Sequence, residues 1–365
     1  MTDQAVETDG SELSEGDRRP AATERHFLGR TRELKELQAD IERAGLDTLT
    51  GRKPPRARVL LIAGRPGSGR TALAEELVRE VAHRYEDGVL RARLSEPDGT
   101  PVPTERTARE LLAALGLPSP PGADEDELGQ AVREALVERR MLLLLDDAVA
   151  ADQVDAVLPE APDCLVVAVS EGPLTGIADV RPCTLGGLDT KSALELLTQY
   201  AGSVRITVDP RAAELLVEEC AGHPASLALA GGWLSVRPKA AVADLAGQLR
   251  AVGDDRPPPA RVFRHSYEAL PNAARRTLRL LSLAPAGLVD PHTASALAGC
   301  SVEDARGALD DFATLGFLRR VDSRMPRYEV PGCLLPLLRA LAEDQDRPAE
   351  LQLARARMLE RTVRL

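Results

Sequence analysis

Residues 64–71, with the sequence GRPGSGRT, have the types and spacing of a phosphate-binding loop. They follow the apolar run RVLLIA at 58–63 and precede the helical pattern TALAEELVREV, the context in which a GxxxxGK[ST] pattern is credible. Glycines let successive backbone N–H groups turn toward phosphate oxygens, and the helix N-terminus adds partial positive charge. We therefore assign nucleotide binding to the following residues: Gly64, Gly67, Ser68, Gly69, Arg70, Thr71 and Ala72.

Arg70 stands where this pattern usually has lysine. Arginine keeps the positive charge, but its guanidinium is planar and bulkier than an ammonium group, so the exchange changes the geometry of a tight site. Binding can survive that change. The alternative is a glycine-rich turn between a strand and a helix that holds no ligand.

Two aspartates, Asp146 and Asp147, follow the apolar run MLLLL at the carboxyl end of another expected strand, where open α/β sheets bind ligands. Beside a phosphate loop, Thr71 and Asp146 would hold Mg²⁺, and Asp147 would orient or deprotonate an attacking water. Asp147 is therefore the candidate catalytic residue. Without that loop, the pair would fit a turn and a helix cap equally well.

The elements that must position these residues alternate along the first half of the chain. Strands are expected at 58–63, 88–94, 141–146, 164–170 and 181–185, and helices at 70–83, 107–115 and 126–140. Three of the strands are continuous apolar runs, which suits strands covered on both faces. The pattern predicts a nucleotide-binding α/β domain over 25–187, a parallel sheet with helices on both faces.

From residue 188 onward the pattern is helical. Leu and Ala recur at three- and four-residue intervals in four segments, which predicts a four-helix bundle over 188–253. A proline-rich break at 254–260 is followed by four expected helices and two short strands, FLRRVD and RYEV, separated by a turn at 323–325. This order is typical of a winged helix and predicts one over 254–345. We expect a C-terminal helix over 346–365 and a disordered acidic tail over 1–24, which makes the fold class α/β plus α.

Composition excludes several classes of protein. The 365 residues carry a formal net charge of -11, which argues against a generic binder of nucleic acid or anionic membranes. No stretch has the length and apolarity of a membrane span, and the N-terminus lacks a signal-peptide pattern. The five cysteines are scattered and never spaced as CxxC, so a reducing, cytoplasmic location is expected.

With both motifs placed, the chain from about Phe27 to Leu341 resembles the NB-ARC branch of the STAND P-loop ATPases. HFLGRTREL at 26–34 is similar to a family motif in which an apolar residue and an arginine line the adenine pocket, and Leu28 and Arg30 are the matching positions. GHP at 222–224 is similar to a motif whose proline packs on adenine, here Pro224. The resemblance implies ATP or ADP with Mg²⁺ as ligands.

Three polar contacts that read the phosphate state in that family are altered. Besides Arg70, Glu171 stands where the family has an arginine that senses the γ-phosphate. Pro331 and Gly332 replace the histidine and aspartate of a motif that contacts the β-phosphate of ADP. Because hydrolysis needs charge stabilisation at the γ-phosphate, we predict nucleotide binding with weak or absent turnover.

Three functions are open on this evidence. The first is a nucleotide-dependent signalling switch with protein partners and a nucleotide-dependent oligomer. The second is a degenerate scaffold or adaptor, either free of nucleotide or permanently loaded. The third is transcriptional control through the winged helix. Its arginines are interleaved with acids, and the family packs this domain on the nucleotide module, so nucleic acid is not the expected partner.

Overall fold

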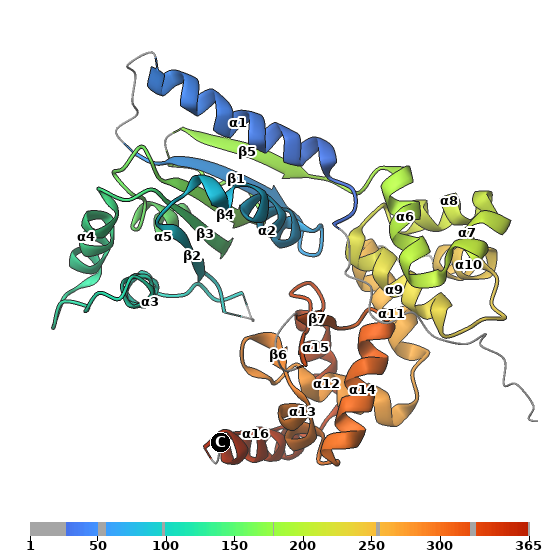
Figure 1. Cartoon of the computed structure of the whole chain (residues 1–365). Helices are drawn as coiled ribbons and strands as arrows, with labels where there is room; N and C mark the ends of the chain where they lie inside the picture. The colour runs from blue at the N-terminus through green and yellow to red at the C-terminus, as the bar shows by residue number, and fades with distance from the viewer. Residues whose placement is uncertain are drawn as a thin grey trace, which may run out of the picture.

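The computed structural model describes residues 27–49, 56–96, 99–177, 179–252, 256–321 and 326–363. The predicted tail at 1–24 and the predicted turn at 323–325 lie outside this range. Figure 1 shows a sheet with its helices, a second group of helices (α6–α10) beside it and the C-terminal helices below. No helix within the described ranges combines the length and apolarity needed to cross a membrane.

Five parallel strands form the sheet in the order β2-β3-β4-β1-β5. The strand predictions are confirmed within one or two residues. The strands are β1 (Arg58–Gly64), β2 (Gly88–Arg93), β3 (Met141–Ala148), β4 (Leu165–Ser170) and β5 (Val180–Leu185). This order places β1, which carries the loop, between β4 and β5, so the loop emerges from the interior of the sheet.

Helices cover both faces of the sheet, as predicted. α1 (Thr31–Leu49) and α2 (Arg70–Val81) pack on one face, against β1 side chains such as Leu60 and Ile62. α3 (Thr104–Ala114), α4 (Glu125–Leu136) and α5 (Ala151–Asp155) share the opposite core with Val59 and Leu61 of the same strand. Burial of alternate side chains on both faces explains why the strands read as continuous apolar runs.

The next segment contains five helices, where four were predicted. They are α6 (Thr190–Ala201), α7 (Ser203–Val208), α8 (Pro210–Glu219), α9 (Pro224–Ser235) and α10 (Val242–Ala251). The unpredicted helix is α7, whose sequence SVRITV is rich in β-branched residues and has no helical period of its own. It follows Gly202 at the end of α6 and is anchored by Arg205, which donates to the carbonyl oxygens of Leu234, Arg237 and Ala240.

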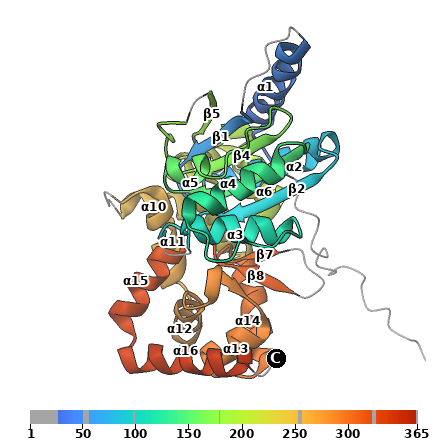
Figure 2. The same cartoon turned by 90° about the vertical axis from the view of Figure 1, so that its left-hand side faces the viewer.

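The C-terminal part contains α11 (Pro258–Glu268), α12 (Asn272–Leu281), α13 (Pro291–Ala298) and α14 (Val302–Thr314). Short strands β6 (Leu288–Val289), β7 (Arg319–Val321) and β8 (Arg327–Glu329) form an antiparallel sheet in the order β6-β8-β7. This arrangement is compatible with the winged-helix prediction. α15 (Leu335–Gln345) and α16 (Pro348–Val363) close the described chain, and α16 crosses the base of the molecule in Figure 2.

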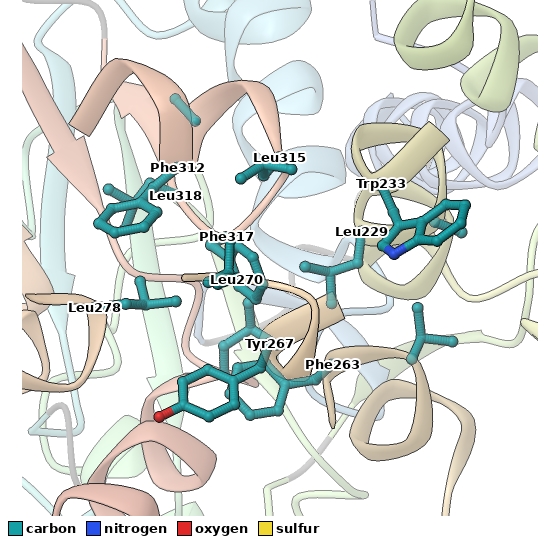
Figure 3. Packing of buried hydrophobic residues seen from close by; sticks show 14 of the residues in the cluster. Leu229, Trp233, Phe263, Tyr267, Leu270, Leu278, Phe312, Leu315, Phe317 and Leu318 are labelled. Atoms are coloured by element: carbon teal, nitrogen blue, oxygen red, sulfur yellow. The ribbon is translucent and has the colours of Figure 1, made fainter. Parts of the chain in front are cut away.

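One hydrophobic core joins the helices from α6 to α16. Several of the chain's few aromatic residues meet in it, including Phe263, Phe312 and Phe317, with Trp233 of α9 nearby (Figure 3). Gly232 allows α9 to contact the end of α14, because a Cβ added there would lie 2.3 Å from the carbonyl oxygen of Leu315. This close packing fixes the helix whose N-terminus faces the phosphate loop.

Replacing Gly232 with alanine tests this packing. We expect Gly232→Ala to lower the free energy of unfolding by about 2 kcal/mol, because overpacking a close contact costs about 1–3 kcal/mol. Gly247 in α10 is the matched control, since it is helical and exposed and an added Cβ there meets nothing within 4 Å. Gly247→Ala should raise stability by about 0.5–1 kcal/mol. Urea denaturation that ranks the two variants in the opposite order would contradict the assigned contact.

Candidate nucleotide-binding site

The loop between β1 and α2 contains several backbone N–H groups without an acceptor among the described residues. Gly69 occupies the N-cap position of α2 in a left-handed conformation (φ 91°) and, as a glycine, has no side chain to cap the helix. In the described chain, no hydrogen-bond acceptor is found for five N–H groups, those of Gly67, Gly69, Arg70, Thr71 and Ala72. Unpartnered donors at a helix N-terminus are suited to binding an anion.

Arg70 is buried at the start of α2, with its side chain 8% exposed. Its Nη2 donates to Oδ1 of Asp147 at 3.2 Å, while its buried Nη1 has no partner within the described residues. A buried guanidinium with an unused donor beside free N–H groups is a second indication that this loop binds an anion.

Thr71 and Asp146 lie in contact, as a shared magnesium site requires. The hydroxyl of Thr71 donates to Oδ1 of Asp146 at 3.0 Å. Burial, and then the negative charge of Asp147, raise the pKa of Asp146 to about 6. Hydroxyl and carboxylate oxygens fit Mg²⁺, which binds few protein ligands and completes its shell with water and phosphate oxygens. No cluster of three His, Cys, Asp or Glu side chains suited to a metal ion occurs in the described part of the chain.

Asp147 lies in an irregular segment at the end of β3. The strand continues beyond the predicted end at Asp146, and its register against β4 shifts between Leu145 and Ala148. Asp147 has a positive φ of 53°. Side chains of consecutive strand residues normally point to opposite faces, and this distortion lets Asp146 and Asp147 both reach the start of α2.

Arg93 completes the charged cluster and was not found from the sequence. Its Nη2 lies 3.0 Å from Oδ2 of Asp147, so two arginines bind the two oxygens of that carboxylate. Arg93 is the last residue of β2 and pairs in register with Asp146 of β3. Arg93 could have been predicted from its place at the carboxyl end of a neighbouring parallel strand, where ligand-binding residues are commonly found.

A cleft of about 680 Å³ lies over the loop. Its walls come from both halves of the chain. The sheet half contributes residues after β1, β2, β3 and β4, and the C-terminal half contributes Arg319, Glu329 and a segment that begins at Pro331. Seven of the predicted site residues line it, including the candidate catalytic residue Asp147: Gly67, Gly69, Arg70, Thr71, Ala72, Asp146 and Asp147.

The positions at which the sequence differs from the NB-ARC pattern also lie in this cleft. Glu171, which follows β4, lines it together with Pro331 and Gly332. Cys333, missed in the sequence analysis, packs on the loop, because a Cβ on Gly67 would lie 2.8 Å from its sulfur. Burial raises the pKa of the Cys333 thiol to about 11, which keeps it protonated. The C-terminal half therefore contacts the loop through an uncharged segment.

The N-terminus of α9 contacts the loop from another side. His223 caps this helix, its Nε2 lies 3.0 Å from the carbonyl oxygen of Pro66, and the N–H of Ala225 donates to the carbonyl oxygen of Gly67 at 3.3 Å. Burial lowers the pKa of His223, which favours the neutral ring. Pro224 lies 4.0 Å from the position of a Cβ on Gly69 and is not itself in the cleft wall.

Arg30 supports the loop from behind and is not part of the cleft wall. Its buried guanidinium donates to the carbonyl oxygens of Ser68, Gly186 and Gly187 and pairs with Glu33. These bonds tie the loop to the segment between β5 and α6. Of the other predicted binding residues, Leu28, Gly64 and Ser68 also lie outside the cleft wall.

The strand order, the loop and its acidic partner define a P-loop NTPase fold. Residues 55–165 match a family model described as an AAA domain. The fold also matches that of a Signal Transduction ATPase with Numerous Domains (STAND) protein with a tetratricopeptide repeat sensor from Pyrococcus horikoshii, with a TM-score of 0.58 and 16% identity. That match covers 93% of this chain and 48% of the other.

The sequence is similar to two curated regulatory proteins. It is 28% identical over 360 residues to Regulatory protein AfsR of Streptomyces coelicolor and 27% identical over 349 residues to that of Streptomyces griseus. These alignments cover 94% and 93% of the chain. The chain spans 35% of the length of each relative.

Replacing Arg30 tests its role in supporting the loop. Arg30→Met keeps much of the side-chain length and leaves the carbonyl oxygens of Ser68 and Gly186 without their donor. We expect it to lower the free energy of unfolding by about 3 kcal/mol, since a hydrogen bond to a charged group contributes about 1.5–3 kcal/mol.

Arg32→Met is the matched control, because that side chain is 87% exposed and pairs with Glu36 on the surface of α1. Arg32→Met should lower the free energy of unfolding by less than about 1 kcal/mol, with both variants measured by urea denaturation. Equal costs for the two variants would show that the bonds of Arg30 do not hold the loop.

Proposed function

We propose that the cleft binds an adenine nucleotide and that the chain acts as a nucleotide-dependent regulatory protein with little ATP hydrolysis. The observation that carries this proposal is the set of backbone N–H groups without an acceptor among the described residues, those of Gly67, Gly69, Arg70, Thr71 and Ala72, all of which line the cleft. The first N–H groups of a helix have no acceptor within the helix, and phosphate oxygens are acceptors that such a terminus suits. Adenine is favoured over guanine by the resemblance of the motifs at 26–34 and 222–224.

Weak hydrolysis follows from the state of Asp147. A carboxylate that positions or deprotonates water needs an oxygen free to accept its proton. Both oxygens of Asp147 are in ion pairs, with Arg70 and Arg93. Glu171, in the position expected to contact the γ-phosphate, adds negative charge to the cleft. Binding without efficient turnover is the consequence.

A switching role is supported by the walls of the cleft. Residues from β7 and from the segment after β8 face the loop, so a bound nucleotide would touch both halves of the chain. Ligands that bridge two parts of a protein shift their relative placement. Thr71 and Asp146 would hold Mg²⁺, and protein partners or a nucleotide-dependent oligomer in the cytoplasm would respond to the bound state.

Nucleic acid is not the partner that we propose. Several arginines of the candidate winged helix are engaged with acids: Arg319 pairs with Glu329, Arg320 with Asp310 and Arg276 with Glu350. Arg279 is buried in an ion pair with Asp346. Such pairing reduces the positive charge that phosphate backbones require.

Thermal unfolding with ligands tests the proposal. ADP and ATP at millimolar concentration should raise the melting temperature, since a ligand present at 100 times its Kd stabilises by about 2.7 kcal/mol. Adenosine, which lacks phosphate, should give a much smaller shift. Gly69→Glu should abolish the ADP shift, whereas Gly307→Glu, an exposed helical position with open space, should retain it.

Phosphate release measured on the same samples should stay at the background rate. Absence of any ADP or ATP shift would favour a nucleotide-independent scaffold. ATP turnover that disappears in Asp147→Ala would contradict weak hydrolysis.

A further inference from the structure

Two arginines share one carboxylate at the carboxyl ends of β2 and β3. Arg93 and Arg70 approach Asp147 at 3.0 Å and 3.2 Å, each through one guanidinium nitrogen and each to a different oxygen. The side chains of Arg70, Asp147 and Arg93 are 8%, 24% and 35% exposed, so the cluster is partly shielded from water. Ion pairs in such surroundings hold side chains in fixed positions more strongly than pairs on the surface.

Neither guanidinium is saturated by Asp147. A guanidinium has five N–H donors, and each arginine uses one nitrogen in this pair. Nη1 of Arg70 and Nε of Arg93 are buried and have no acceptor among the described residues. Both side chains line the cleft with the free N–H groups of the loop. The unused donors and the loop therefore form one anion-binding surface.

The charges of this cluster differ from those of the common P-loop pattern. A lysine faced by two aspartates leaves one negative charge in excess, which a divalent cation neutralises when phosphate binds. Here Arg70 and Arg93 face Asp146 and Asp147, so two positive charges already oppose two negative ones. Phosphate would enter a site whose two aspartates are compensated by the chain itself, with Glu171 as a further acid in the cleft wall.

We propose that Arg70 and Arg93, both held by Asp147, form a paired-arginine clamp that binds the diphosphate of the nucleotide and makes a divalent cation dispensable for binding. The inference rests on the proposed function, because it concerns the same cleft. It assigns a phosphate-binding role to Arg93, which lies outside the loop. Asp147 orients the two guanidinium groups and, in this role, does not activate water.

Titration of the wild-type protein with ADP tests the clamp without any substitution. Calorimetry is run once with excess Mg²⁺ and once with excess EDTA. The dissociation constants should agree within about threefold, a difference well below the tenfold change that corresponds to one strong contact.

Substitutions then distinguish a specific phosphate contact of Arg93 from the general effect of removing a positive charge. Arg93→Gln should weaken ADP binding in EDTA roughly tenfold or more, the value of a lost charge-assisted hydrogen bond, and should make the affinity dependent on Mg²⁺. Arg91→Gln is the matched control, because Arg91 lies two residues away on β2, is exposed and pairs with Glu75 outside the cleft. It should bind ADP as the wild type does.

The outcomes distinguish the clamp from the underlying function. Binding of ADP with Mg²⁺ and no binding in EDTA would overturn the clamp and leave the proposed nucleotide site intact. No binding under either condition would overturn both. Equal affinities of the wild type with and without Mg²⁺, together with a selective loss in Arg93→Gln, would establish the clamp.

Discussion

The ion pairs of Asp147 with Arg70 and Arg93 are the constraint on which the chemistry of the cleft depends. A carboxylate between two arginines at 3.2 Å and 3.0 Å is held in position and has both of its oxygens in ion pairs. The same contacts fix the two guanidinium groups beside the unpartnered N–H groups of the loop. In the proposed function, this one interaction favours anion binding and disfavours water activation.

The rest of the fold keeps the loop in place around this cluster. Arg30 donates to the carbonyl oxygen of Ser68. At the start of α9, His223 contacts the carbonyl oxygen of Pro66, and the N–H of Ala225 donates to that of Gly67. Cys333 packs against the loop. α9 is in turn packed closely on the end of α14. A change at the loop can therefore reach the helical half through backbone contacts, which is the physical basis of the proposed switch.

Local pattern sufficed for the parts of the site that are contiguous in sequence. The apolar strand, the glycine spacing and the following helix predicted the loop, and the continuous apolar runs predicted a sheet covered on both faces. The doubled aspartate, taken together with the loop, predicted that Asp146 and Thr71 would hold one Mg²⁺ ion, and the structure places the two side chains 3.0 Å apart.

Contacts between distant segments could not be predicted in this way. Arg93 is 54 residues from Asp147 and His223 is 157 residues from Pro66, and nothing in their local sequences specifies those partners. The distortion of β3 at Asp147 depends on its register against β4. α7 was missed because its β-branched residues lack a helical period, and its place is fixed by Arg205 bonds to the end of α9. Tertiary contacts override local preference at these positions.

A structure determined with ADP bound would test the central claim most directly. The account predicts the phosphates on the N–H groups between Gly67 and Ala72, with Arg70 and Arg93 each contacting both a phosphate oxygen and Asp147. An ADP molecule bound elsewhere, or one whose phosphates contact the loop while Asp147 is released from both arginines, would contradict it.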